Sequence, residues 1–292
     1  MKKIDLHIHS KCSDGRMTIS DIIKEAAQRG IGLISITDHD TIEGQEEAIQ
    51  LANPYGIKYL TGLELSITFS HPGSHSVKSI SLDFLAYGYN IQYVPLVNKL
   101  RDLKEYREKR ALEILEKINI ELEKGNQQKF TQKDMKEIQD SVDGTFGRPH
   151  IANFLVKKGV VSNRQEAFDK YLVRCNVPKM PLSLPEASEL VKGAGGKLIF
   201  AHPSDPRGTS LIKLTQDLDA QQEVIRDMMM PFIDGIECFH SMHNRKTTES
   251  YISFAQTMNL MITGGTDCHQ QPVLMGSLDI PIYVAEEFGF IL

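Results

Sequence analysis

The sequence predicts an α/β fold in which short apolar strands alternate with helices. The stretch "IGLISITDH" at residues 31–39 is almost entirely apolar, as is typical of a parallel strand covered on both faces. The stretch before it, "TISDIIKEAAQRG" at residues 18–30, has the periodicity of an amphipathic helix. About seven strand patterns alternate with helical patterns in this way, which favours a parallel barrel or a wound parallel sheet.

The elements of residues 1–92 follow in order. The first strand is expected at "KKIDLHIH", where apolar and polar residues alternate. In the helix after it, Thr18 and Asp21 have the spacing of a capping box, and Gly30 is a typical stop. Beyond the apolar strand, a short helix is expected at residues 41–52, and the strand patterns "IKYLTGLELSITF" and "SISLDFLAYGY" complete this part.

The rhythm changes at residue 93. Residues 93–124 have the pattern of a long, charged, amphipathic helix, and shorter helical patterns follow, so a helical insertion is expected over residues 93–184. Strands and helices alternate again over residues 185–292, with strands at "KLIFAHP", "DGIECFH" and "LMITGGTDCH". In a parallel barrel the reactive groups gather at the carboxyl ends of the strands, which directs attention to the residues that end each pattern.

Composition and charge argue against several classes of protein. A formal charge of −5 disfavours binding to long duplex nucleic acid, which depends on many Lys and Arg contacts. No apolar run is long enough to cross a membrane. Asp5 and His7 interrupt the apolar stretch near the N-terminus, which argues against a signal peptide and favours a cytoplasmic protein. The four cysteines show no CxxC spacing, so reduced thiols are expected.

Histidines and carboxylates are concentrated at the ends of the predicted strands. Side chains at positions i and i+2 of a strand share a face, so His7 with His9, and Asp267 with His269, are pairs that can each bind a metal from one side. Imidazole and carboxylate ligands together suit Zn²⁺, Mn²⁺ or Fe²⁺. The full set comprises the histidines His7, His9, His39, His202 and His269 and the carboxylates Asp14, Glu64, Asp83 and Asp267.

Each part of this set also has a plainer interpretation. A single HxH pair is often unrelated to metal, and the "TDHD" sequence can cap the helix that follows it. A lone histidine at the end of an apolar strand, such as His202, is commonly a core residue with its hydrogen bonds satisfied. Metal binding is favoured because the five histidines fall at strand ends and the four carboxylates fall at strand ends or just beyond them.

Five motifs resemble those of the PHP family, named for polymerase and histidinol phosphatase. They are "DLHIHSKCSDG", "GLISITDHDTIEG", "GLELS", "AHP" and "GGTDCH", and they span nearly the whole chain. The segment "GRPHIANFLVKKGVVSNRQEAFDKYL" resembles the insertion of a subfamily of nucleotide phosphatases and 5′→3′ exoribonucleases. The resemblance implies a distorted (β/α)7 barrel made of residues 1–92 and 185–292, with residues 93–184 inserted as a helical cap.

The resemblance also implies a cluster of two or three divalent metal ions, Mn, Zn or Fe. The first ion would be bound by His7, His9, Glu64 and Asp267. The second would be bound by Asp14, His39 and His269. The third would share Glu64 and add Asp83 and His202.

One position departs from the family pattern, because Asp83 stands where family members commonly have histidine. Aspartate can still bind metal, but it is a harder and more anionic ligand. His71 and His75, in "SHPGSHS", are candidates to replace the imidazole, or else solvated residues of a surface loop. Asp38 is expected to orient a liganding histidine, and neither it nor Asp40 is expected to be a metal ligand.

Arg148, in "GRPH" on the insertion, is the candidate for binding phosphate, since a guanidinium offers a bidentate fork to phosphate oxygens. The alternative is an arginine at a helix start that pairs with a nearby acid. His150 and His243 are further candidates for contact with the substrate, and His240 is a weaker one. The insertion would then act as a cap that closes over the substrate.

Clustered metals favour phosphoester hydrolysis, because they acidify water and hold phosphoryl oxygens. His202 and Asp267 are candidates for moving protons as well as ligands. The prediction is a hydrolase acting on a small nucleotide, such as a nucleoside 3′,5′-bisphosphate, or on the 5′ end of short RNA. The alternatives are a phosphatase of the histidinol phosphate type or for another small molecule, and a catalytically silent metal-binding regulatory module. Neither a membrane nor a long nucleic-acid duplex is an expected partner.

Overall fold

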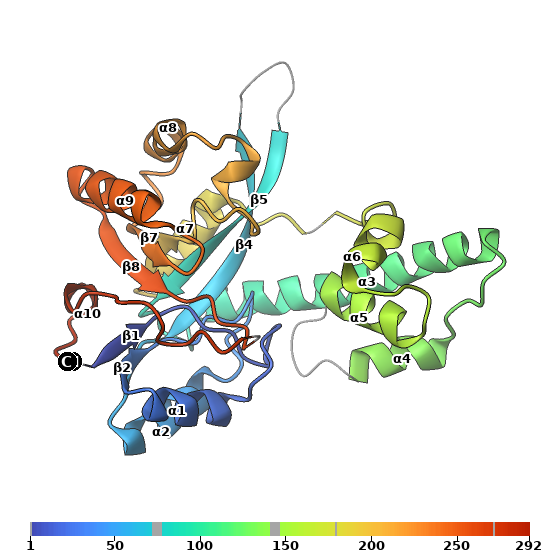
Figure 1. Ribbon diagram of the computed structural model, residues 1–292, viewed down its shortest axis with the longest axis horizontal. Coiled ribbons are helices and arrows are strands. Elements are labelled where there is room, and N and C mark those ends of the chain that lie inside the picture. Colours follow the sequence, from blue (N-terminus) through green and yellow to red (C-terminus); the bar gives the residue numbers. More distant parts are fainter. Residues whose placement is uncertain (1, 72–77, 141–146, 179, 271) are drawn as a thin grey trace. The chain divides into compact units, whose positions relative to one another are not determined.

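The computed structural model describes residues 2–71, 78–140, 147–178, 180–270 and 272–292 (Figure 1). The chain forms two compact units. Residues 1–98 and 181–292 make up the first unit, and residues 99–180 make up the second. The strands all belong to the first unit, so the strand ends predicted to carry the site lie within one compact body.

Eight strands in the described part of the chain form two sheets. The three-stranded sheet has the order β1-β2-β3 and is parallel throughout. The five-stranded sheet has the order β4-β5-β6-β7-β8. The strands are β1 (Lys3–Asp5), β2 (Ile31–Ile34), β3 (Lys58–Tyr59), β4 (Gly62–His71), β5 (Lys78–Tyr87), β6 (Lys197–Phe200), β7 (Gly235–His240) and β8 (Met261–Gly265).

The larger sheet is mixed, which differs from the parallel arrangement expected from the sequence. β4 and β5 pair antiparallel over their whole lengths, from Gly62 with Tyr87 to His71 with Lys78. β5 also pairs antiparallel with β6, whereas β6, β7 and β8 are mutually parallel. The physical reason is chain length, because only residues 72–77 connect β4 to β5 and a parallel crossover needs about a dozen residues.

In the described residues two single bridges join segments that follow strands of the smaller sheet to the first strand of the larger one and to the segment after its last strand. Ile8, just beyond β1, pairs with Cys268, just beyond β8, and His39, beyond β2, pairs with Glu64 on β4. Both bridges lie past or near the ends of the regular ladders, in the part of the fold where the predicted ligands occur. The α/β class is confirmed, and closure into a seven-stranded barrel stays a prediction.

Helices flank the strands of the first unit. Side-chain oxygens of Thr18, Ser183, Asp217 and Asn244 cap four of them by accepting backbone N–H groups, as residues of these types do at helix starts. Thr18 accepts from the amide of Asp21, which confirms the predicted cap. The helices are α1 (Ile19–Gln28), α2 (Gln45–Ala52), α7 (Leu184–Gly193), α8 (Leu218–Met228), α9 (Arg245–Thr257) and α10 (Tyr283–Glu286), with short 3₁₀ turns at Asn53–Tyr55 and Leu211–Lys213.

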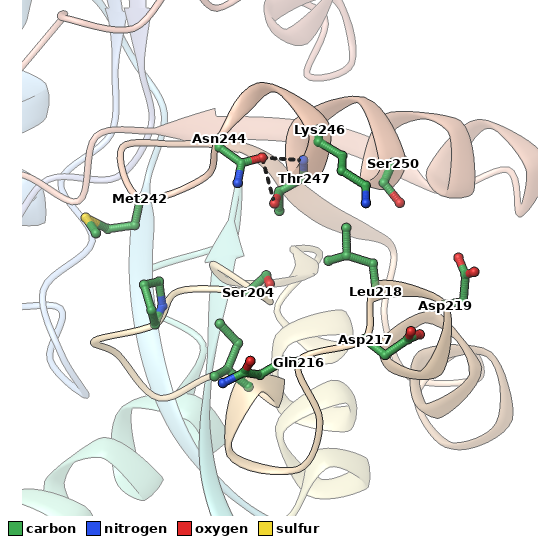
Figure 2. Close-up of a pocket in the computed structure, with 12 residues that line it drawn as sticks. Ser204, Gln216, Asp217, Leu218, Asp219, Met242, Asn244, Lys246, Thr247 and Ser250 are labelled. Carbon is green, nitrogen blue, oxygen red and sulfur yellow. Dashed lines mark hydrogen bonds between the residues drawn. The ribbon is translucent and has the colours of Figure 1, made fainter.

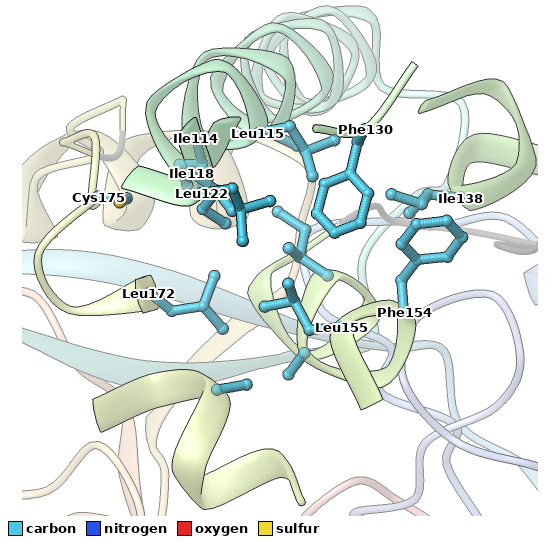
Figure 3. Close-up of a cluster of buried hydrophobic side chains, with 14 of the residues drawn as sticks. Ile114, Leu115, Ile118, Leu122, Phe130, Ile138, Phe154, Leu155, Leu172 and Cys175 are labelled. Atoms are coloured by element: carbon cyan, nitrogen blue, oxygen red, sulfur yellow. The ribbon is translucent and has the colours of Figure 1, made fainter. Parts of the chain in front are cut away.

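The second unit is helical and has its own apolar core. Figure 3 shows side chains such as Leu115, Phe130 and Leu155 gathered in this core, and all three are buried. The helices are α3 (Val94–Lys124), which begins in the first unit, α4 (Gln132–Asp140), α5 (Arg148–Lys157) and α6 (Arg164–Ala167), followed by a π-helical turn at Phe168–Leu172. Within the residues described, no helix combines the length and the apolar character that a membrane span needs.

Candidate metal centre

The bridge between Ile8 and Cys268 sets the register of the site. Because this bridge is parallel, the residues on either side of Ile8, His7 and His9, lie beside Asp267 and His269, the residues on either side of Cys268. His7 and His9 are completely buried. The alternation of strand side chains therefore brings both sequence pairs to one place, as their spacing predicted.

Four predicted ligands meet in the first group. Nε2 of His9 lies 3.2 Å from Oε2 of Glu64 and 3.1 Å from Oδ1 of Asp267. Nε2 of His7 lies 3.5 Å and 3.4 Å from the same two oxygens. Ligand atoms bound about 2.0–2.2 Å from one ion are themselves about 3 Å apart, so this spacing is that of a metal site.

A second group lies next to the first. Nε2 of His269 is 3.0 Å from Oδ1 of Asp14, and Nε2 of His39 is 3.9 Å from Oδ2 of Asp14. These three residues and His9 can each offer one ligand atom within 4.8 Å of the others. The structure thus brings together the predicted second set and adds His9 to it.

The residues of the predicted third set are divided between two groups. Nε2 of His202 is 3.1 Å from Oε1 of Glu64, and His202 also forms a group with His7 and Asp267. Asp83, on β5, groups instead with Glu64 and His39, and it accepts a hydrogen bond from the hydroxyl of Thr209. Among the described residues no such group contains both Asp83 and His202, so Glu64 is the residue that connects them.

The donor set fits divalent metal ions. Nε2 of His7, Nε2 of His9 and Oε2 of Glu64 are buried and make no hydrogen bond. Buried polar atoms are normally hydrogen-bonded, so a convergence of such atoms indicates a site that fits a cation. The ligand atoms are nitrogen and carboxylate oxygen, with no thiolate, which suits catalytic metals rather than a closed structural zinc site.

The charges of these groups depend strongly on one another in the metal-free protein. Burial lowers the pKa of His7, but the carboxylates of Glu237 and Asp267 outweigh it and hold that pKa well above its usual value. Burial raises the pKa of Asp267, but His7 and its neighbours reverse this and lower it well below the usual range. The carboxylates therefore stay ionised at neutral pH, as metal ligands must be.

Glu237, on β7, is a buried residue that the sequence analysis missed. Its Oε1 lies 2.9 Å from Nδ1 of His7, and its Oε2 accepts the backbone N–H of His202 at 2.8 Å. Because Nδ1 donates to Glu237, Nε2 is the nitrogen that faces Glu64 and Asp267 and would bind a metal once its own proton is displaced. Glu237 thus fixes the ring of one predicted ligand and the backbone of another. The only signal in the sequence is a charged residue inside the apolar strand "DGIECFH".

Asp5 was also missed, although it precedes His7 by two residues on the same strand pattern. Its carboxylate accepts hydrogen bonds from the amide and hydroxyl of Thr266 and from the amide of Gly276. Burial is the main cause that raises the pKa of Asp5 to about 6. This buried carboxylate ties the segment that carries the first histidine pair to the segment that carries Asp267.

Asp38 is linked to His9 by hydrogen bonds through an intermediate residue, Ser13. Its carboxylate accepts from the amide and hydroxyl of Ser10, and from the hydroxyl of Ser13 at 2.5 Å. The Ser13 oxygen in turn lies 3.4 Å from Nδ1 of His9. Asp40 accepts the amide of Ser66, on β4.

His240 and His243 extend the cluster beyond Asp267. Nδ1 of His240 accepts the amide of Met242 at 3.3 Å, so its proton is on Nε2, which lies 3.7 Å from Oδ2 of Asp267. Nδ1 of His243 donates to the carbonyl of Cys238 at 3.0 Å. Burial, followed by the neighbouring His240, lowers the pKa of His243 to about 4, so this ring is neutral.

Arg148 and His150 lie in the second unit, at the start of α5. The guanidinium of Arg148 lies over the ring of Phe168 at 5.6 Å, and burial lowers its pKa. No carboxylate of the described chain pairs with Arg148, and both interpretations of this arginine, phosphate binding and pairing with a nearby acid, stay predictions. Nδ1 of His150 accepts the amide of Gly147 at 3.1 Å. The proposed roles of His75 and of the His71 side chain fall outside the described residues.

Comparisons with known proteins identify relatives of this chain. The PHP domain pattern matches residues 5–170. A protein of Haemophilus influenzae named a 5′-3′ exoribonuclease is 30% identical over 276 residues, covering 92% of this chain and 90% of its own. A 3′,5′-nucleoside bisphosphate phosphatase of Chromobacterium violaceum is 29% identical over 282 residues, with 92% and 88% covered.

A solved structure extends the similarity to the whole fold. The crystal structure of a protein described as a metal-dependent phosphoesterase, from Bifidobacterium adolescentis, superposes with a TM-score of 0.76 at 27% identity and covers 98% of this chain and 95% of its own. The strand ends, the convergent ligand atoms and these matches together show that the chain belongs to the PHP domain family.

Proposed function

We propose that this protein is a metal-dependent phosphoric ester hydrolase. Its substrate is the phosphomonoester of a small nucleotide, such as a nucleoside 3′,5′-bisphosphate, or the 5′ end of a short RNA. The observation that carries the proposal is the convergence of His7 and His9 on Glu64 and Asp267, with each imidazole Nε2 3.1–3.5 Å from an oxygen of each carboxylate. The substrate class is supported by the names of the relatives from Haemophilus influenzae and Chromobacterium violaceum.

Two or three divalent ions, Mn, Zn or Fe, would be bound by the nine predicted ligands. When bound, such ions supply an activated water and positive charge for the phosphoryl oxygens. The ligands are His7, His9, Asp14, His39, Glu64, Asp83, His202, Asp267 and His269. They come from strands, strand ends and loops far apart in the sequence, and the fold brings them into groups whose ligand atoms lie within 4.8 Å of one another.

The chain's own groups perform the remaining tasks. Glu237 keeps the proton of His7 on Nδ1, so that Nε2 is free for a metal. His240 directs its Nε2 proton toward Oδ2 of Asp267, 3.7 Å away, and so can stabilise the negative charge of that carboxylate. His202 and Asp267 are the proposed groups for moving a proton in the reaction. Arg148, His150 and His243 are the proposed contacts to the substrate.

The remaining structural predictions belong to the same proposal. Residues 1–92 and 185–292 would close into a distorted (β/α)7 barrel, and residues 93–184 would serve as a cap over its mouth. The free thiols of all four cysteines are consistent with a cytoplasmic protein.

The test is the release of inorganic phosphate from adenosine 3′,5′-bisphosphate by Mn²⁺-loaded protein, with and without a chelator. Release that the chelator abolishes, and that exceeds release from histidinol phosphate and phenyl phosphate, supports the nucleotide hydrolase. Equal rates on all three substrates would favour a phosphatase of broader or different specificity. Metal binding without hydrolysis of any of the three would favour the silent regulatory module.

A further inference from the structure

A cavity of about 600 Å³ lies in the first unit, between the start of α8 and the start of α9 (Figure 2). It is large enough for a nucleoside, because ligand pockets have volumes of about 300–1,000 Å³. None of the nine predicted metal ligands lines this cavity. Ser204, two residues beyond the predicted ligand His202, forms part of its wall.

The cavity adjoins the metal centre through one histidine. Met242 also lines the cavity, and its backbone amide donates to Nδ1 of His240 at 3.3 Å. The other nitrogen of that ring is 3.7 Å from Oδ2 of Asp267. A single imidazole ring therefore separates the wall of the cavity from a predicted metal ligand.

The charge of the lining disfavours phosphate. Asp217 and Asp219 face the cavity together with Lys246, so two carboxylates and one ammonium give a formal charge of −1. The two helix starts are also engaged already, because Asp217 accepts the amide of Ala220 and Asn244 accepts the amide of Thr247. An anion would therefore meet like charge and amides that are already hydrogen-bonded.

The remaining lining suits an uncharged heterocycle. Leu218 and Met242 offer apolar surface, and Figure 2 shows Gln216 and Asn244 from opposite sides of the cavity. In the described structure neither the amide group of Gln216 nor the amide nitrogen of Asn244 makes a hydrogen bond. A nucleobase has apolar faces and an edge of donors and acceptors, and proteins recognise it with apolar contacts and amide groups.

We propose that this cavity binds the nucleoside part of the substrate, with the base against Leu218 and Met242 and its edge within reach of Gln216 and Asn244. The inference rests on the proposed function, since it assigns the part of the nucleotide that is not hydrolysed. The phosphomonoester would then face the side of the cavity that Met242 and His240 connect to the metal centre.

The test is the binding of adenosine, which has no phosphate, to the metal-loaded protein by calorimetry. Leu218→Trp fills the cavity and should weaken adenosine binding at least tenfold. Gln216→Ala removes an exposed amide without touching the core and should weaken it several-fold. Glu249→Gln is the matched control, because Glu249 is on α9 but pairs with Arg245 outside the cavity, and its affinity should equal that of the unaltered protein.

Two results would overturn the proposal. One is the absence of adenosine binding to the unaltered protein at millimolar concentration. The other is equal affinity in the unaltered protein, Leu218→Trp and Gln216→Ala, with thermal unfolding showing that the variants are folded. Phosphate release from adenosine 3′,5′-bisphosphate is measured separately, so failure of the proposed function, with adenosine still bound in the cavity, is a distinguishable outcome.

Discussion

Replacing Glu237 with glutamine tests whether the residues behind the ligands control metal binding. The carboxylate has two acceptor oxygens, one 2.9 Å from Nδ1 of His7 and one 2.8 Å from the amide of His202. Glutamine keeps the shape but has one oxygen and one NH₂ group. It can satisfy only one of the two donors, and it turns its own N–H groups toward the other.

The expected loss of metal affinity follows from these two contacts. If the amide oxygen accepts from His202, the NH₂ group faces Nδ1 of His7 and favours the tautomer with its proton on Nε2, which cannot bind a metal. A hydrogen bond to a buried charged group contributes about 1.5–3 kcal/mol. At about 1.4 kcal/mol for each factor of ten, metal affinity should fall about 10- to 100-fold.

Affinity for Mn²⁺ is measured by competition with a chromophoric chelator, and kcat is measured with metal in excess. Glu249→Gln, an exposed change of the same chemistry, is the control and should bind Mn²⁺ normally. An affinity of Glu237→Gln within twofold of the control would refute the argument that this carboxylate fixes the ring of His7. A lower thermal stability with unchanged affinity would show a purely structural role.

Three further predictions concern the backbone, the second unit and pH. Gly265→Ala should abolish metal binding or destabilise the fold by several kcal/mol, because the new Cβ would lie 2.3 Å from the backbone nitrogen of His7. The control is Gly125→Ala, whose Cβ would meet no atom closer than 3.5 Å and which should leave thermal unfolding nearly unchanged. Arg148→Ala should raise the KM for phosphorylated substrates about tenfold or more. The amount of bound metal, measured by atomic emission, should not change. An unchanged KM would show that Arg148 is not part of the substrate site. In metal-free protein the pKa of His202 is raised to about 9, against the lowering effect of burial, chiefly by Glu64. Protonation of His202 therefore stabilises the folded protein by about 3 kcal/mol below pH 6.5, and this stabilisation is lost as the pH rises toward 9. The Tm should show this loss in the presence of chelator and should not show it in Mn²⁺-loaded protein.

The gathering of the ligands was predictable because it depends on local periodicity. His7 and His9 share a face by strand alternation, and Asp267 and His269 do so for the same reason. That the two pairs meet requires only that strand ends lie at one edge, which parallel strands provide. The bridge of Ile8 with Cys268 realises that expectation.

The direction of β4 and β5 could not be predicted in the same way. Apolar and polar residues alternate along "LELSITFS" and "SISLDF", which indicates strands with one apolar face but does not by itself give the direction in which they pair. The short connection at residues 72–77 was the available signal, since it excludes a helical crossover. The role of Glu237 could not be predicted for another reason. Its partner His7 lies 230 positions away in the sequence, and no local pattern identifies Glu237 as that partner.

The aspartate at position 83 bears on how many ions the centre holds. With neutral imidazoles, the four carboxylates Asp14, Glu64, Asp83 and Asp267 give the ligand set a charge of −4, which two divalent ions balance. A third ion would leave an excess of +2 in a buried site, where uncompensated charge is costly. A phosphomonoester dianion supplies the two missing negative charges. We therefore expect two ions to bind without substrate and a third ion to bind together with the substrate. With histidine at position 83 the ligand charge would be −3 and a third ion would leave an excess of +3, so Asp83 makes the third ion less costly.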